Sequence, residues 1–278
     1  MDKQLFQIRP EYIAGKKVYL IDIDPSEPYL ADHDVGVPLF GTVLSLEAMS
    51  EAICQDTGMK PDVIRDLVSG ADCLVKEKKH LFCEIKKDET DSEIRFVKLL
   101  DADSLVFQCS MHLVPAGYFS HPTQNNLPVF HSQHSDPDPK NSDRLVQCSE
   151  EIYRILFHGP AFQVLRKVYT EGDTLIGEYE NNAKPLLRDG TSPVILPMRM
   201  IEFCLQTSGM YDLVFRKAMR VPLGIGSIRI LDQKYTESVP ALARASGKTG
   251  SCDICAFSPQ GNPLLKIENY QTKELPYH

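Results

Sequence analysis

The sequence predicts an α+β protein made of two similar halves, in which each half packs one long helix on an antiparallel sheet. Two observations support this fold class. In both halves an amphipathic helix, expected over residues 42–57 and 194–217, is followed by several short apolar or alternating segments typical of strands. Such an order indicates helices layered on antiparallel sheets. A stretch rich in Pro, Ser, Asn, Asp and His separates the halves.

Composition excludes several classes of protein. The chain has 278 residues, of which 42% are hydrophobic and 24% charged, and its formal charge of -8 argues against a nucleic-acid binder. No window approaches the ~20 apolar residues of a membrane helix. The N-terminus lacks an apolar signal region, so we expect a cytoplasmic location. A disulfide framework is then not expected from the eight cysteines, and Cys252 and Cys255 lack the further ligands that zinc requires.

The first half is expected to begin with a strand over residues 16–23. In the helix over 42–57, Val43, Leu46, Met49 and Ile53 recur at helical spacing, and Gly58 is a typical helix end. Four further strands are expected at 72–75, 79–86, 94–100 and 104–114.

Residues 116–150 have no periodicity and are expected to form a linker. Their histidines, His121, His131 and His134, lack the spacing of a pair on one helix face, so we do not expect a metal site there. The predicted organisation is therefore a first domain over 1–115, a linker over 116–150 and a second domain over 151–278.

The second half repeats the order of the first. A short helix or turn is expected at 149–157, before the helix at 194–217 and a set of strands. These strands are expected at 163–170, 174–181, 221–231, 239–246, 250–257 and 263–272. The halves share this architecture although they do not share sequence.

One candidate site lies in residues 29–49, where His33 precedes a Gly/Pro-rich turn that leads into the helix at 42–57. Free backbone N–H groups at a helix start can polarise a carbonyl group, and a histidine beside them can act as a base. The alternative is an ordinary loop histidine.

A second candidate site lies on the helix at 194–217. Glu202 and Gln206 are four residues apart and therefore share a helix face with Met198, Ile201 and Leu205. Burial on such an apolar face raises the pKa of a carboxyl group and suits a general acid. The alternative is a partly exposed Glu–Gln pair at the helix edge.

Four motifs in the same order and spacing resemble the dehydratase domains of polyketide synthases. They are residues 24–49 around His33, HGPAFQ at 158–163, Glu202-x-x-x-Gln206, and VPLGIGSIRI at 221–230. The resemblance covers roughly residues 15–275 and is closest to the iterative enediyne and polyunsaturated-fatty-acid synthase branch. It implies a double hotdog fold, in which two antiparallel sheets each wrap a long central helix.

The resemblance implies a hydro-lyase that dehydrates a 3-hydroxyacyl thioester on an acyl carrier protein to a 2-enoyl thioester. In this reaction His33 removes the α-proton, Glu202 protonates the departing hydroxyl, and Gln206 orients either the acid or the hydroxyl. The expected substrate and oxyanion contacts are Gly36, Gly41, Thr42, Pro160 and Phe162. No cofactor or metal is implied beyond the phosphopantetheine that carries the substrate.

The implied partners are the acyl carrier protein, other synthase domains and a second copy in a homodimer. Residues 151–278 carry 13 acidic and 15 basic side chains, whereas residues 1–115 carry 21 and 13. An acidic carrier is therefore expected to approach the second half. Arg216, Lys217 and Arg220 cluster there and are the predicted docking residues.

The chain departs from the family pattern at both reacting residues. Only two residues separate His33 from Gly36, one fewer than in the family, and Glu202 replaces the usual aspartate. Glu47, which lies where single-hotdog dehydratases carry a catalytic glutamate, is expected to be structural. Two alternatives stay open: a catalytically silent acyl-binding or structural double hotdog, and a cyclase that resembles product-template domains.

Overall fold

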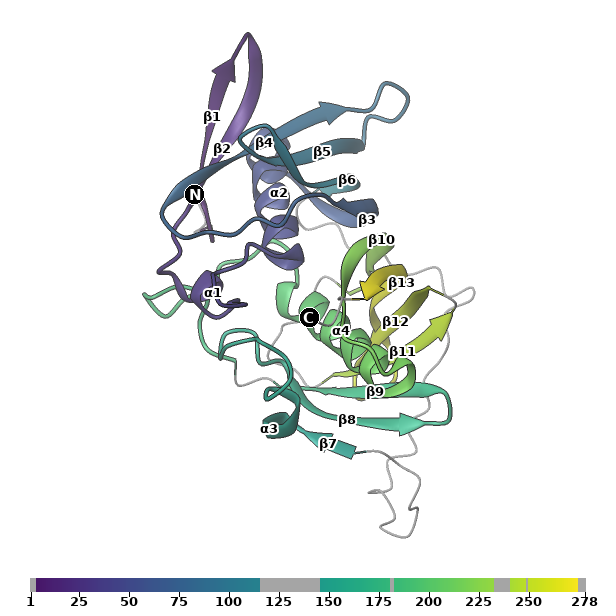
Figure 1. Ribbon diagram of the computed structural model, residues 1–278. Coiled ribbons are helices and arrows are strands. Elements are labelled where there is room, and N and C mark those ends of the chain that lie inside the picture. Colours follow the sequence, from purple (N-terminus) through teal and green to yellow (C-terminus); the bar gives the residue numbers. More distant parts are fainter. Residues whose placement is uncertain (1–3, 116–145, 181–182, 233–240, 249, 275–278) are drawn as a thin grey trace.

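The chain forms two helix-and-sheet halves whose strands belong to one continuous sheet (Figure 1). The computed structural model describes residues 4–115, 146–180, 183–232, 241–248 and 250–274. Within them, 13 strands follow the order β1-β2-β4-β5-β6-β3-β10-β13-β12-β11-β9-β8-β7. All the pairs of neighbouring strands are antiparallel. The predicted α+β double hotdog is therefore confirmed.

The first half surrounds helix α2 (Thr42–Thr57), whose bounds match the prediction. Residues Thr42 to Ile53 of α2 are all buried, which is why this helix is apolar on most of its circumference. It ends at Gly58, whose φ of 71° is favourable for glycine. The other elements are β1 (Gln7–Ile13), β2 (Lys16–Ile23), α1 (Pro28–Ala31), β3 (Met59–Ser69), β4 (Lys79–Lys87), β5 (Ile94–Asp101) and β6 (Ser104–Pro115).

The second half surrounds helix α4 (Met198–Tyr211), which continues as a π-helix, η1 (Asp212–Arg216). Its other elements are β7 (Val146–Cys148), α3 (Ser149–Ile152), β8 (Leu165–Glu171), β9 (Thr174–Tyr179), β10 (Arg220–Ile230), β11 (Leu242–Lys248), β12 (Ser251–Phe257) and β13 (Pro263–Glu274). Among the helices that the structure describes, none has the length and apolar character needed to cross a membrane.

The two halves are joined through strands β3 and β10. These strands pair from Gly224 opposite Val68 to Arg229 opposite Val63, so the sheet of one half continues into that of the other. Strand β10 also pairs with β13 on its other side, which places it in the interior of the sheet. The predicted pair of sheets is thus fused at one edge, and separating the halves would break backbone hydrogen bonds.

Several predicted elements differ from the structure. Residues 72–75 are not a strand: they lie against the loop at 38–40, with Phe40 donating to the Cys73 carbonyl and Val75 to that of Pro38. The helix predicted over 194–217 begins only at Met198, after Pro197, and strands β1 and β3 were missed. Most of the predicted linker, residues 116–145 with the three histidines, lies outside the described residues, so the division into domains stays a prediction.

Two buried carboxylates tie helix α2 to distant segments. Glu47 accepts hydrogen bonds from the backbone N–H groups of Ile195 and Leu196, in the loop before α4, the latter at 2.9 Å. Glu51 accepts from those of Leu5 and Phe6, at 2.6 and 3.1 Å. Buried carboxylates are costly unless they are hydrogen bonded, so these contacts fit the structural role expected of Glu47.

Candidate active site

His33 is held by the turn that follows helix α1. Asp34 pairs with Pro38 across this turn, and Gly36 at its tip has a φ of 98°. The Leu39 N–H donates to the His33 carbonyl, and the Leu39 carbonyl lies 2.8 Å from Nδ1 of the His33 ring. A carbonyl can only accept, so Nδ1 carries the proton and Nε2 keeps its lone pair. The turn thereby presents a ring nitrogen that can accept a proton.

The surroundings of His33 keep it neutral. Its side chain is buried, and its ring lies edge-on to Phe157, His158 and Phe162 at centroid distances of 5.1, 5.2 and 5.7 Å. Burial and then the nearby His158 lower the pKa of His33 to about 4. The ring is therefore available as a base at neutral pH.

Glu202 is fixed by a chain of hydrogen bonds on helix α4. Gln206 donates from Nε2 to Glu202 Oε1 at 2.9 Å and to the Phe162 carbonyl at 2.8 Å. The Gln206 Oε1 in turn accepts from the Tyr153 hydroxyl at 2.8 Å, and that hydroxyl accepts from the Leu165 N–H. These contacts hold the Glu202 carboxylate in place, and the orienting role of Gln206 in a reaction stays a prediction.

His158 completes the cluster and was not singled out by the sequence analysis. Its Nε2 lies 3.0 Å from Glu202 Oε1, and its backbone pairs with that of His33 as an isolated antiparallel bridge. Asp32 reinforces this bridge, because its carbonyl accepts from Gly159 and its carboxylate from Ala161, both at 2.7 Å. The sequence did contain a signal for His158, because this residue begins the HGPAFQ motif at 158–163. The sequence analysis used that motif only to support the family resemblance.

The structure thus brings His33 of the first half and Glu202 of the second to one buried place, although 169 positions separate them in the sequence. The cluster is compact: one nitrogen or oxygen atom can be chosen from each side chain so that all three atoms lie within 4.8 Å of one another. The three side chains are those of His33, His158 and Glu202. In the described part of the chain this is the one group of three such side chains close enough to hold a metal ion. The same spacing suits proton transfer across a small substrate.

The expected protonation of Glu202 was wrong. Burial does raise the pKa of the Glu202 carboxyl group, but His158, His33 and Gln206 lower it by more, and the net pKa lies below its ordinary value. The apolar helix face predicted only the burial, because the histidines come from segments that are distant in sequence. Glu202 is therefore ionised at neutral pH.

The other predicted contact residues lie around the cluster. Gly41 is the N-cap of α2 beside the His33 ring, and Thr42 begins that helix. The Gly41 N–H already donates to the Leu39 carbonyl, so the first-turn N–H of Thr42 is the better candidate for an oxyanion contact. Phe162 packs on His33, whereas Pro160 is exposed and its carbonyl accepts from the Lys184 N–H.

The three predicted docking residues differ in how free their charges are to contact a partner protein. Arg216 and Arg220 both form ion pairs with the buried Asp212, and Arg216 also donates to the Ser251 carbonyl. Lys217 is exposed, with a positive φ of 56° at the end of η1. Carrier docking at this surface stays a prediction, in which Lys217 is the most accessible charge.

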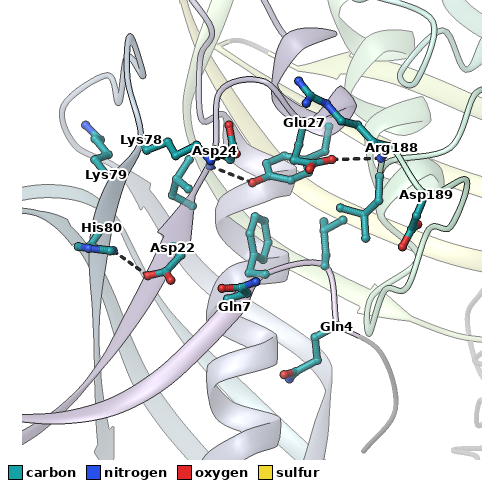
Figure 2. A pocket seen from close by; sticks show the side chains of 15 residues that line it. Gln4, Gln7, Asp22, Asp24, Glu27, Lys78, Lys79, His80, Arg188 and Asp189 are labelled. Carbon is teal, nitrogen blue, oxygen red and sulfur yellow. Dashed lines mark hydrogen bonds and ion pairs between the residues drawn. The ribbon is translucent and has the colours of Figure 1, made fainter.

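A hollow of about 680 Å³ lies away from the cluster, at the junction of the two halves (Figure 2). Polar groups that line it are engaged with one another: His80 pairs with Asp22 at 2.7 Å, and the backbone N–H of Arg188 donates to the Glu27 carboxylate at 3.1 Å. None of its lining residues is His33, His158 or Glu202.

Replacing Gly41 with alanine is expected to lower kcat by roughly 100-fold, because a small displacement of a reacting group has an effect of that size. A Cβ atom at Gly41 would lie 2.4 Å from Cε1 of His33, and the neighbouring aromatic rings restrict how that ring can move. The measurement is steady-state dehydration of a thioester substrate.

The matched control is G209A on helix α4, where a new Cβ would meet no atom within 4 Å. Alanine is a better helix former than glycine, so G209A should keep kcat and raise Tm slightly. Equal kcat values for G41A and G209A would contradict the close approach of Gly41 to His33.

Three comparisons relate the chain to known proteins. The family described as "Polyketide synthase dehydratase N-terminal domain" matches residues 130–278. The dehydratase domain from the CurF module of the curacin polyketide synthase is 16% identical, with a TM-score of 0.72 over 96% of this chain and 97% of that one. A trans-AT polyketide synthase dehydratase domain from Brevibacillus brevis is 15% identical, with a TM-score of 0.72 over 98% of both chains.

Two further matched structures are of one protein, the CurK dehydratase. One is an inactive mutant in which phenylalanine replaces a histidine, at 16% identity, and the other an inactive mutant in which asparagine replaces an aspartate, at 17% identity. Both have a TM-score of 0.67 over 96% of this chain, and over 95% of theirs. No curated protein matches the chain significantly.

Proposed function

This chain belongs to the polyketide synthase dehydratase family, and on that premise we propose that it dehydrates a 3-hydroxyacyl thioester, carried by an acyl carrier protein, to a 2-enoyl thioester. The observation that carries the proposal is the buried apposition of His33 and Glu202 from opposite halves. A base and an acid on either side of a 3-hydroxyacyl group are what elimination of water requires.

In the proposed reaction His33 Nε2 removes the α-proton of the thioester. The first-turn N–H of Thr42 lies at the positive end of helix α2, where it would stabilise the charge that develops on the thioester oxygen. Glu202 and its hydrogen-bonded neighbours supply the proton that converts the departing hydroxyl into water. Gln206 keeps the carboxylate in place through its bond to the Phe162 carbonyl.

Two further observations support this assignment. The CurK dehydratase is inactive when a histidine or an aspartate is replaced, and the cluster in this chain likewise contains a histidine, His33, and an acidic residue, Glu202. Glutamate is one methylene longer than aspartate, which offsets the shorter turn between His33 and Gly36. The retained cluster favours an active enzyme over a silent acyl-binding or structural domain.

The finer assignments are part of the same proposal. Residues 24–49 support placement in the iterative enediyne and polyunsaturated-fatty-acid synthase branch. An acyl carrier protein and other synthase domains are the proposed partners, with a second copy of the chain in a homodimer. A cytoplasmic location and a role in polyketide or fatty-acid-like biosynthesis follow from the same resemblance.

The direct test is to incubate the protein with a 3-hydroxyacyl-N-acetylcysteamine thioester and to follow the loss of one water by mass spectrometry. The proposal expects a 2-enoyl thioester from the wild-type protein. A folded protein that forms no enoyl product from carrier-bound or small substrates of several chain lengths would support the silent alternative. Ring closure of a poly-β-keto thioester without dehydration would support the cyclase alternative.

The activity is expected to persist in moderately acidic solution. A base must be unprotonated, and the pKa of His33 is lowered to about 4 by burial and by His158. The value of kcat/KM should therefore fall only as the pH drops through about 4, whereas a histidine base with the ordinary pKa of 6.5 would lose activity as the pH drops through 6.5. Initial rates across this range, at constant ionic strength, provide the measurement. An acidic limb centred near 6.5 would contradict the desolvated state of His33.

A further inference from the structure

We propose that His158, in its doubly protonated form, directly donates the proton to the leaving hydroxyl group, and that Glu202 is the counter-ion that keeps this imidazole charged. The inference rests on the proposed dehydratase function and assigns the acid step to a residue outside the His33–Glu202 pair. His158 is buried, lies 3.0 Å from Glu202 and has its ring centroid 5.2 Å from that of His33.

The unpartnered nitrogen of His158 is the main observation. Its Nε2 is engaged by Glu202, whereas its Nδ1 is fully buried and, among the residues that the structure describes, has no hydrogen-bond partner. A buried polar nitrogen without a hydrogen-bond partner is rare in folded proteins and requires an explanation. A substrate hydroxyl placed between the two imidazole rings would supply the missing acceptor.

The hydrogen-bond chain on α4 determines which group of the pair holds the proton. Tyr153 accepts from the Leu165 N–H, so its own O–H donates to Gln206 Oε1. This bond turns the amide of Gln206 so that its NH₂ group faces Glu202 Oε1. That oxygen therefore accepts from Gln206 and also faces His158 Nε2. Two donors on one oxygen favour a carboxylate, which has no proton to give, and place a proton on Nε2 of His158.

The two imidazoles then have opposite roles that balance the reaction. His33 Nε2 takes the α-proton, and the C–H electron pair forms the new double bond. The C–O bond breaks, its electron pair stays on oxygen, and this oxygen takes the Nδ1 proton of His158 and leaves as water. The resting state returns when the proton on His33 Nε2 passes to His158 Nδ1 through the released water.

The test compares two leaving groups in the wild-type protein, H158Q and H33F. Elimination of hydroxide requires a general acid, whereas elimination of fluoride from a 3-fluoroacyl-N-acetylcysteamine thioester requires only the base. We expect H158Q to eliminate water about 10²–10⁴-fold more slowly than the wild type, and fluoride at a rate close to that of the wild type. H33F should lose both reactions. The matched control is H80Q, at an exposed histidine that pairs with Asp22, and it should change neither reaction.

Two results would overturn the assignment. If H158Q slows both eliminations equally, His158 serves to maintain the shape of the site and is not the acid. In that case H158F, which restores the packing of an aromatic ring, should restore both rates. If H158Q slows neither, the proton comes from another group. These results differ from failure of the dehydratase function itself, in which the wild-type protein would eliminate neither water nor fluoride.

Discussion

Replacing His33 with alanine is expected to lower kcat for dehydration by about 10²–10⁴-fold, the usual contribution of a general base. The reason is that Nδ1 of His33 donates to the Leu39 carbonyl, so Nε2 keeps its lone pair and is the nitrogen that can accept a proton. Steady-state rates with a 3-hydroxyacyl-N-acetylcysteamine thioester provide the measurement. The KM should change less than kcat, because the lost interaction is made in the transition state.

The control for this variant concerns folding. A histidine in a loop ordinarily contributes little to a core, but His33 is only 5% exposed and its ring packs against three aromatic rings. H33A therefore leaves a cavity and should also lower Tm, whereas H33F fills the volume and cannot accept a proton. Loss of kcat in both variants, with Tm largely retained in H33F, is the expected pattern. Normal turnover by folded H33F would exclude His33 as the base.

The second large effect is expected for E202Q, which should also lose about 10²–10⁴-fold in kcat. A neutral amide can still accept from Gln206, so the shape of the site is kept, but the carboxylate that pairs with His158 is removed. The acid step then lacks its charged partner. Dehydration rates and Tm, measured on the same preparations, separate the loss of chemistry from the loss of stability.

Glu47 offers a matched control because it is a buried glutamate on the equivalent helix of the other half. Its carboxylate accepts from two backbone N–H groups. In E47Q an amide NH₂ group, which cannot accept, faces one of these donors, so the free energy of unfolding should fall by about 1–3 kcal/mol. The kcat per folded molecule should remain that of the wild type. If E47Q abolished turnover and E202Q did not, the assignment of the reacting groups to the two halves would be reversed.

The elements that could be predicted are those specified by local sequence. Helix α2 was predicted to the residue because its apolar spacing and Gly58 are both local signals. Strand β3 was missed because Pro61, Asp62 and Asp66 interrupt the alternation that marks a strand. The structure accommodates them with shifts in the pairing of β3 with β6, and Asp66 has a φ of 53°.

The candidate site was predictable only in part for a related reason. His33, Glu202 and Gln206 each lie in a recognisable motif, and each motif could be interpreted separately. The contact of Glu202 with His158 depends on an antiparallel bridge between segments 125 positions apart. Burial and ion pairing shift the pKa of Glu202 in opposite directions, so its protonation followed only from the folded arrangement.

The pairing of β3 with β10 also limits how substrates arrive and depart. Moving the halves apart would break this pairing and would draw His33 away from Glu202, so the paired strands oppose hinge opening. Access then depends on rotation of rim side chains such as Phe157, which is 43% exposed and stacks on His158. Such rotations take picoseconds to nanoseconds, whereas hinge motions take microseconds to milliseconds. We therefore expect the proposed turnover to be limited by the chemical step or by product release, and not by a hinge motion of the two halves.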